Sequence, residues 1–165
     1  MIVVADTSPL NYLIRLGYPE VLHEIYGRVL APGAVLIELQ HSDAPSEVRA
    51  WASAPPAWLE ERQVQQFDGS LAAELGDGER EAISLALEAK ADILLMDERA
   101  GRQEAEARQI EVAGTLAVLL QASSRGNFDF PEALKQLRRY RFRASQAVEA
   151  TMLARYEQAK KLGKA

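Results

Sequence analysis

Short apolar runs alternate along residues 1–124 with segments in which apolar residues recur every three or four positions. Continuous runs rich in Val, Ile and Leu are typical of strands buried on both faces, and the recurring pattern is typical of amphipathic helices. The predicted strands are 2–5, 28–32, 58–64, 93–96 and 110–114, and the predicted helices are 8–17, 19–27, 33–40, 44–56, 76–90 and 115–126. This alternation predicts an α/β domain with a mainly parallel sheet.

The last part of the chain has a different pattern. Residues 131–142 and 145–162 form two amphipathic stretches with no predicted strand between them. We therefore expect residues 1–124 to form one domain, and residues 125–165 to form a helical extension packed on that domain.

Composition and charge narrow the class of protein. The chain has 165 residues and no cysteine, which excludes disulfides, thiolate metal sites and cysteine nucleophiles. It has neither a signal-peptide pattern nor a long apolar run, so we expect a cytoplasmic protein. Residues 1–124 carry 9 Lys and Arg against 20 Asp and Glu, whereas residues 125–165 carry 10 against 4. The basic segment is interpreted either as a surface for a nucleic acid or an acidic partner, or as a solvated helix face.

Two acidic residues stand where predicted strands end. Asp6 follows Ile2–Ala5, and Asp97 follows the run 93–96. Thr7 and Ser8 precede Pro9, which predicts a helix with a hydroxyl N-cap and the proline at the first helical position. In open parallel sheets, sites form beyond the carboxyl ends of the strands, so Asp6 and Asp97 are candidate site residues.

Three glutamates on predicted helices add to this set. Glu38 interrupts the apolar stretch 35–39, where a charged side chain needs the surface or a partner. Glu79 and Glu81 lie near the start of the helix 76–90, where carboxylates also suit the helix dipole. Because residues two apart do not share a helix face, only one of these two should join a common site. Their spacing alone does not choose between them.

Carboxylates that converge require a counter-charge. Two unit charges about 4 Å apart repel by roughly 4 kcal/mol at an effective dielectric of about 20. With no cysteine and two histidines in the chain, a set of oxygen ligands favours Mg²⁺ or Mn²⁺ over zinc. Such a cation activates water and neutralises charge on a phosphodiester, so hydrolysis of a nucleic-acid backbone is the expected chemistry.

The segments VVADTSPL, VLIEL, GEREAISLA and ILLMDERAGR occur in this order along the chain. Together they resemble the PIN domain family, in particular its VapC-like branch of toxin ribonucleases, over Ile2 to about Ser124. The resemblance implies a three-layer α/β/α fold with a sheet of about five strands. It also implies Mg²⁺- or Mn²⁺-dependent cleavage of RNA, a homodimer, and inhibition by a small antitoxin protein.

The resemblance also assigns roles by position. Asp6 matches the first metal-binding acid, Glu38 the second and Asp97 the fourth. The acid directly before Ala-Ile occupies the third position, which favours Glu81, and leaves Glu79 a supporting role near the metal. Ser8 matches a small polar residue that orients Asp6.

Further residues near these motifs are candidates for substrate contact. Arg99 and Arg102 follow Asp97, and a guanidinium matches phosphate oxygens, although exposure at a helix start is the simpler interpretation. Asn11 lies one turn after Ser8 and is a candidate to hydrogen-bond a carboxylate or a water molecule. The segment 138–142, RRYRF, fits either an RNA-binding surface or a basic helix end.

Two other functions remain as alternatives. One is a catalytically inactive PIN-like module that binds a protein or RNA partner. The other is a phosphatase with Asp6 as nucleophile, but such enzymes place a second Asp two residues later, where this chain has Ser8.

Overall fold

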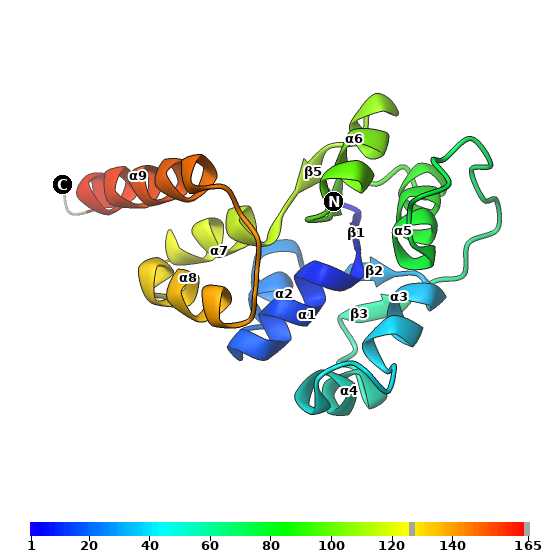
Figure 1. Ribbon diagram of the computed structural model, residues 1–165, viewed down its shortest axis with the longest axis horizontal. Coiled ribbons are helices and arrows are strands. Elements are labelled where there is room, and N and C mark those ends of the chain that lie inside the picture. The colour runs from blue at the N-terminus through cyan, green and yellow to red at the C-terminus, as the bar shows by residue number, and fades with distance from the viewer. Residues whose placement is uncertain (126–127, 164–165) are drawn as a thin grey trace. The chain divides into compact units, whose positions relative to one another are not determined.

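A computed structural model describes residues 1–125 and 128–163 of the protein (Figure 1). The chain divides into two compact units, Met1–Thr115 and Leu116–Ala165. The expected packing of a C-terminal extension on the first domain stays a prediction, so each unit is described by itself.

The first unit alternates short strands with helices. Its strands are β1 (Val3–Ala5), β2 (Val29–Ala31), β3 (Leu59–Glu61), β4 (Ile93–Leu95) and β5 (Val112–Ala113). Its helices are α1 (Thr7–Leu16), α2 (Val21–Tyr26), α3 (Gly33–Leu39), α4 (Ser46–Ser53), α5 (Asp77–Glu88) and α6 (Arg99–Ala107). β1, β2 and the last two residues of β4, Leu94 and Leu95, are apolar and buried, as strands covered on both faces must be.

The strands of the described chain form one five-stranded sheet in the order β3-β2-β1-β4-β5. Every neighbouring pair is parallel, and the central pair is set by the register Val3↔Ile93 and Ala5↔Leu95. The chain builds outward from β1 to β3, then returns to place β4 on the other side of β1. Ligands of open α/β sheets bind at such a reversal, beyond the carboxyl ends of the strands. The sequence prediction of a five-stranded parallel α/β fold with C-terminal helices is confirmed.

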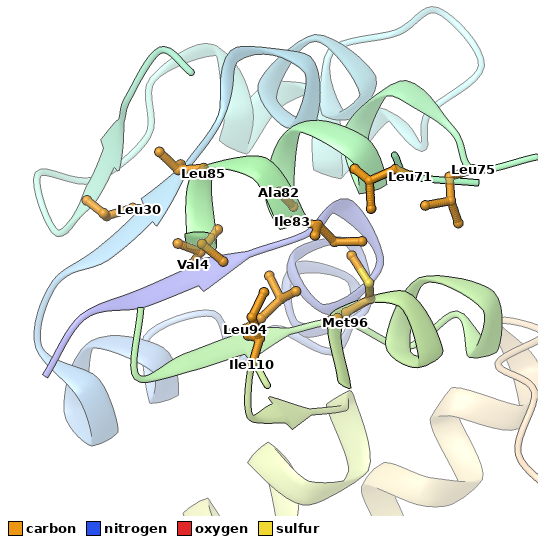
Figure 2. Close-up of a cluster of buried hydrophobic side chains, with 12 residues drawn as sticks. Val4, Leu30, Leu71, Leu75, Ala82, Ile83, Leu85, Leu94, Met96 and Ile110 are labelled. Carbon is orange, nitrogen blue, oxygen red and sulfur yellow. The ribbon is translucent and has the colours of Figure 1, made fainter. Parts of the chain in front are cut away.

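One core cluster joins the sheet to α5 (Figure 2). Val4 of β1 and Leu94 of β4 are fully buried in it, together with Ile83 and Leu85 of α5. α5 packs against β1 and β4, and α3 packs against α5. Burial of a side chain of this size contributes about 1.5–3 kcal/mol, so the cluster fixes the position of α5 over the central strands.

The connection from β3 to α5, residues 62–76, is long for a compact domain and is fastened at several points. The Glu88 carboxylate accepts the backbone N–H groups of Gln65 and Gln66 at 2.8 and 3.0 Å. The Arg108 guanidinium contacts Asp68 Oδ2 at 2.6 Å and Ser70 Oγ at 2.8 Å. These bonds hold the segment immediately before the helix that carries Glu79.

The second unit is helical. It contains α8 (Phe130–Arg139) and α9 (Gln146–Gly163), and α7 (Thr115–Ser123) begins at the last residue of the first unit. The Phe130 ring stacks on Tyr156 at 5.7 Å, and Arg138 forms a 2.6 Å ion pair with Glu149. Within the described residues, no helix has both the length and the apolar character required to cross a membrane.

The structure corrects two local predictions and agrees with one interpretation of a third. α1 begins at Thr7 with Asp6 as its N-cap, so the predicted hydroxyl cap is wrong, and Pro9 is the third helical residue rather than the first. The Thr7 hydroxyl instead donates to the Glu38 carboxylate. The predicted strand 58–64 is reduced to Leu59–Glu61, because the residues after it turn away to begin the long connection. The basic segment 138–142 contains the end of α8 at Arg139, as one of its two interpretations required.

Candidate functional site

Asp6 and Asp97 come together because β1 and β4 are neighbours. Asp6 directly follows β1, and its backbone N–H donates to the Leu95 carbonyl at 2.9 Å, which continues the strand pairing. Asp97 lies two residues beyond the end of β4. Both side chains therefore lie at the carboxyl edge of the sheet, beside the reversal in strand order.

Glu38 reaches this edge from α3 and is held by two donors. The Thr7 hydroxyl donates to its Oε2, and the backbone N–H of Gly78 donates to its Oε1 at 3.0 Å. Thr7 begins α1 and Gly78 lies in the first turn of α5. The only charged residue of α3 thus has the partners that its apolar neighbours cannot supply.

Glu79 joins the other acids, whereas Glu81 does not. The charge of Glu79 acts on Asp6 together with the charges of Glu38 and Asp97. The Glu81 carboxylate instead accepts the backbone N–H of Ala34 at 3.1 Å, at the start of α3. The structure therefore brings Glu79, and not Glu81, together with the other three acids. Asp6, Glu38, Glu79 and Asp97 are called the four-acid site below.

Asp6 has the most unusual environment of the four. Its side chain is 2 % exposed, and its Oδ1 has no hydrogen-bond partner. The pKa of Asp6 is raised to about 8, chiefly by burial and additionally by the charges of Glu79, Glu38 and Asp97, while the backbone N–H of Thr7 partly opposes the rise. A buried carboxylate that faces three others is a position that a cation or a proton must balance.

The carboxyl groups of Asp97 and Glu79 are also perturbed. Burial raises the pKa of Asp97, although the Thr115 N–H and hydroxyl donate to its two oxygens at 2.7 and 2.6 Å. Burial raises the pKa of Glu79 as well, with the charges of Glu98 and Glu38 adding to it and the Gly76 N–H opposing it. The sequence analysis missed Thr7 and Thr115 as supporting residues. Their signal was present, since each follows a strand end on the same edge of the sheet.

Three glycines allow close approach of the acids to the backbone. A β-carbon at Gly78 would lie 2.6 Å from Glu38 Oε2. One at Gly101 would lie 3.0 Å from Glu79 Oε2, and one at Gly114 would lie 2.9 Å from Asp97 Oδ1. Real β-carbons are almost never closer than 3.0 Å to a heavy atom of a neighbouring residue. Any larger residue at Gly78 would therefore displace Glu38, and any larger residue at Gly114 would displace Asp97.

The remaining predicted residues surround the site in different ways. Arg102 Nη1 lies 3.5 Å from the Met96 carbonyl, and its charge lowers the pKa of Asp97. Arg99 is exposed at the start of α6. Ser8 is partly buried on the first turn of α1, and Asn11 lines a cavity next to Glu38.

The donor set fits a hard divalent cation by its chemistry. It supplies carboxylate oxygens only, one of them buried and unpartnered, in a site with excess negative charge. As the side chains stand, no three Asp, Glu or His residues of the described chain form a group that could hold a metal ion. The oxygens of Glu38 and Asp97 accept hydrogen bonds from hydroxyl and N–H donors.

Comparison with known proteins supports the fold. No curated protein matches the chain significantly. Among solved structures, a PilT N-terminus domain protein, SSO1118, from the hyperthermophilic archaeon Sulfolobus solfataricus P2 superposes with a TM-score of 0.55 at 14 % sequence identity. The match covers 74 % of this chain and 93 % of that one. A family model described as DUF3368: PIN domain matches residues 2–158, so the chain belongs to the PIN domain family, whose members are generally nucleases.

Proposed function

We propose that the protein is a Mg²⁺- or Mn²⁺-dependent endoribonuclease whose metal ligands are Asp6, Glu38, Glu79 and Asp97. The observation that carries this proposal is the buried, unpartnered Oδ1 of Asp6 among three further carboxylates. A bound divalent cation would satisfy this oxygen and balance the four acids, which in the absence of metal only a proton on Asp6 would do.

The residues around the acids hold them ready for this role. Thr7 and Gly78 fix the two oxygens of Glu38, and Thr115 fixes those of Asp97. Such outer hydrogen bonds keep ligating carboxylates oriented and deprotonated. Oδ1 of Asp6 has no hydrogen-bond partner in the protein, so a bound cation would stabilise this carboxylate more than the other three.

A cation held by Asp6, Glu38, Glu79 and Asp97 would supply an activated water and would neutralise charge on the phosphodiester. The oxygen of a water molecule bonds to phosphorus as the P–O bond to the leaving nucleotide breaks. A proton from the water then reaches the leaving oxygen, which completes the hydrolysis. Arg102, next to Asp97, and the exposed Arg99 are proposed to attract the substrate phosphate, since acids alone would repel it.

We extend the proposal to the biological role that the motif order suggests: the toxin of a type II toxin–antitoxin pair. In this role the protein acts in the cytoplasm as a homodimer and is inhibited by a small antitoxin. Expression of the chain alone should arrest growth, and co-expression with a small protein from an adjacent reading frame should relieve the arrest. Growth unaffected by the active chain would argue against the toxin role and leave the nuclease intact.

The chemical test uses a matched pair of acids on one helix. Single-stranded RNA is incubated with the protein plus Mn²⁺, with EDTA in place of the metal, and with the variants Asp6→Asn, Glu79→Gln and Glu81→Gln. Cleavage should require the metal, be lost in Asp6→Asn and Glu79→Gln, and persist in Glu81→Gln, whose amide oxygen still accepts the Ala34 N–H. Absence of cleavage, together with no Mn²⁺ binding by calorimetry, would favour the inactive binding module instead.

A further inference from the structure

A cavity of about 340 Å³ lies immediately beside the four-acid site. Residues of α1, α3, α4 and the segment between α3 and α4 line it, and Thr7 and Glu38 form the part next to the acids. Its volume is near the lower end for sites that bind small molecules. Because Glu38 belongs both to the cavity and to the four-acid site, a ligand in the cavity lies next to whatever the acids act on.

The charges on the cavity wall exclude a phosphate. Glu38 and Asp43 contribute carboxylates, and no Lys or Arg is among the described residues that line it. A phosphate would therefore be repelled, whereas a neutral group with N–H donors would find acceptors. Nucleobases with exocyclic amino groups have this character.

The remaining wall suits a flat, partly apolar group. Ile37, Pro45 and Val48 give the cavity an apolar side, and the Ile37 side chain is 70 % exposed. His41 Nδ1 accepts the Asp43 N–H at 3.1 Å, so the ring proton of the neutral imidazole is on Nε2, where it serves as a donor. Asn11 adds a carboxamide with both a donor and an acceptor. Such groups offer hydrogen bonds to a base edge, and Ile37 offers an apolar surface to a base face.

We propose that this cavity is the subsite for one nucleobase of a single-stranded RNA substrate, the base adjacent to the phosphate at the four-acid site. The inference rests on the proposed nuclease function and adds a source of base preference to it. An unstacked base of a single strand enters the cavity, and a base held in a duplex does not.

The first test measures binding without chemistry. Adenosine, guanosine, cytidine and uridine are titrated separately into the ¹⁵N-labelled protein in the presence of EDTA, and backbone resonances are followed by NMR. At least one nucleoside should shift the resonances of Asn11, Ile37 and His41 saturably. Ile37→Ala should weaken this binding about tenfold. Phe67→Ala removes an apolar side chain of similar exposure (63 %) outside the cavity and should leave binding unchanged.

The second test measures base preference during cleavage. RNA oligonucleotides that differ at one position are compared by kcat/KM with the unmodified protein, Ile37→Ala and Phe67→Ala. Ile37→Ala should reduce kcat/KM for the preferred base about tenfold and flatten the preference, whereas Phe67→Ala should not.

The outcomes separate the two proposals. RNA cleavage with no nucleoside binding and an unchanged preference in Ile37→Ala would overturn the base subsite and keep the nuclease. Nucleoside binding in a protein that never cleaves RNA would overturn the nuclease and keep a base-binding cavity. If the resonances of Asn11, Ile37 and His41 do not shift with any of the four nucleosides but do shift when a partner protein binds, the cavity binds that protein and the base subsite is overturned.

Discussion

The backbone N–H of Gly78 donates to Glu38 Oε1 at 3.0 Å, and a β-carbon on Gly78 would lie 2.6 Å from Oε2 of the same carboxylate. α5 and α3 are thus in contact through the backbone of Gly78 and the carboxylate of Glu38. The contact aligns Glu38 and leaves no room for a side chain between the helices.

Gly78→Ala should therefore disrupt the site more than the fold. The new methyl group displaces Glu38, and overpacking of this kind costs about 1–3 kcal/mol, of which the better helix propensity of Ala offsets up to about 1 kcal/mol. Cleavage and Mn²⁺ affinity should fall about 10–100-fold, as when other oriented ligands lose their support. RNA cleavage rates, calorimetry with Mn²⁺ and urea unfolding measure the three quantities.

Gly69→Ala is the matched control, because a β-carbon there meets nothing within 4 Å. Equal losses of metal affinity in both variants would show that Gly78 has no special relation to Glu38.

Without metal, the stability of the protein should fall as the pH rises. Between the ordinary carboxyl pKa of 3.8 and the native value of about 8, folded Asp6 holds a proton that the unfolded chain has lost. Unfolding then releases a proton, so higher pH favours the unfolded state, with a slope approaching about 1.4 kcal/mol per pH unit from this group. The raised pKa values of Glu79 and Asp97 act in the same direction. Urea unfolding in EDTA at pH 5, 6, 7 and 8 measures the slope.

Asp6→Asn isolates the contribution of Asp6, since the amide does not titrate. The variant should lose most of this pH dependence while the other acids keep their smaller share. Parallel stability curves for the two proteins would mean that Asp6 titrates normally in the folded state.

The strand ends made Asp6 and Asp97 predictable, because an apolar run that stops at an acid locates both the strand and its carboxyl edge. The choice between Glu79 and Glu81 was not predictable in the same way. Both lie in the first half of α5, and the rotation of that helix about its axis is set by Ile83 and Leu85 packing on the sheet. That packing turns Glu79 toward Asp6 and Glu81 toward the start of α3.

The capping of the N-terminus of α1 also depended on tertiary structure. The hydroxyl of Thr7 has a helix N-terminus within reach, yet it donates to Glu38, which is distant in sequence. The sequence does not show whether the Thr7 hydroxyl caps α1 or donates to Glu38, because the choice depends on the packing of α3 beside α1.

Mn²⁺ should stabilise the folded protein, and more strongly at pH 8 than at pH 5, because the ligating carboxylates must lose their protons to bind it. At a free concentration 100 times the dissociation constant the gain is about 2.7 kcal/mol. Thermal unfolding with and without Mn²⁺ measures the shift. Glu79→Gln should reduce this shift and Glu81→Gln should retain it; the reverse result would return the third ligand position to Glu81.

Thr115→Val tests the support of Asp97. The substitution keeps the N–H bond to Oδ1 and removes the 2.6 Å hydroxyl bond to Oδ2. The pKa of Asp97 should rise further, since this bond lowers it, and the free energy of unfolding should fall by about 1.5–3 kcal/mol near neutral pH. Urea unfolding and the pH dependence of Mn²⁺ affinity provide the measurements. Thr115→Ser keeps the hydroxyl and should restore both values; a serine variant as impaired as valine would point to packing rather than to the hydrogen bond.

The central position of β1 links the site to the order of synthesis. β1 is synthesised before one of its two neighbours, β4, which begins only at Ile93. A nascent chain shorter than this contains Asp6 without Asp97 and without the strand that buries Asp6. Pairing partners so far apart in sequence must lose much chain entropy before they meet, which slows folding. The four acids can therefore assemble only after Asp97 has been synthesised, so a nascent chain that ends before β4 lacks the complete site.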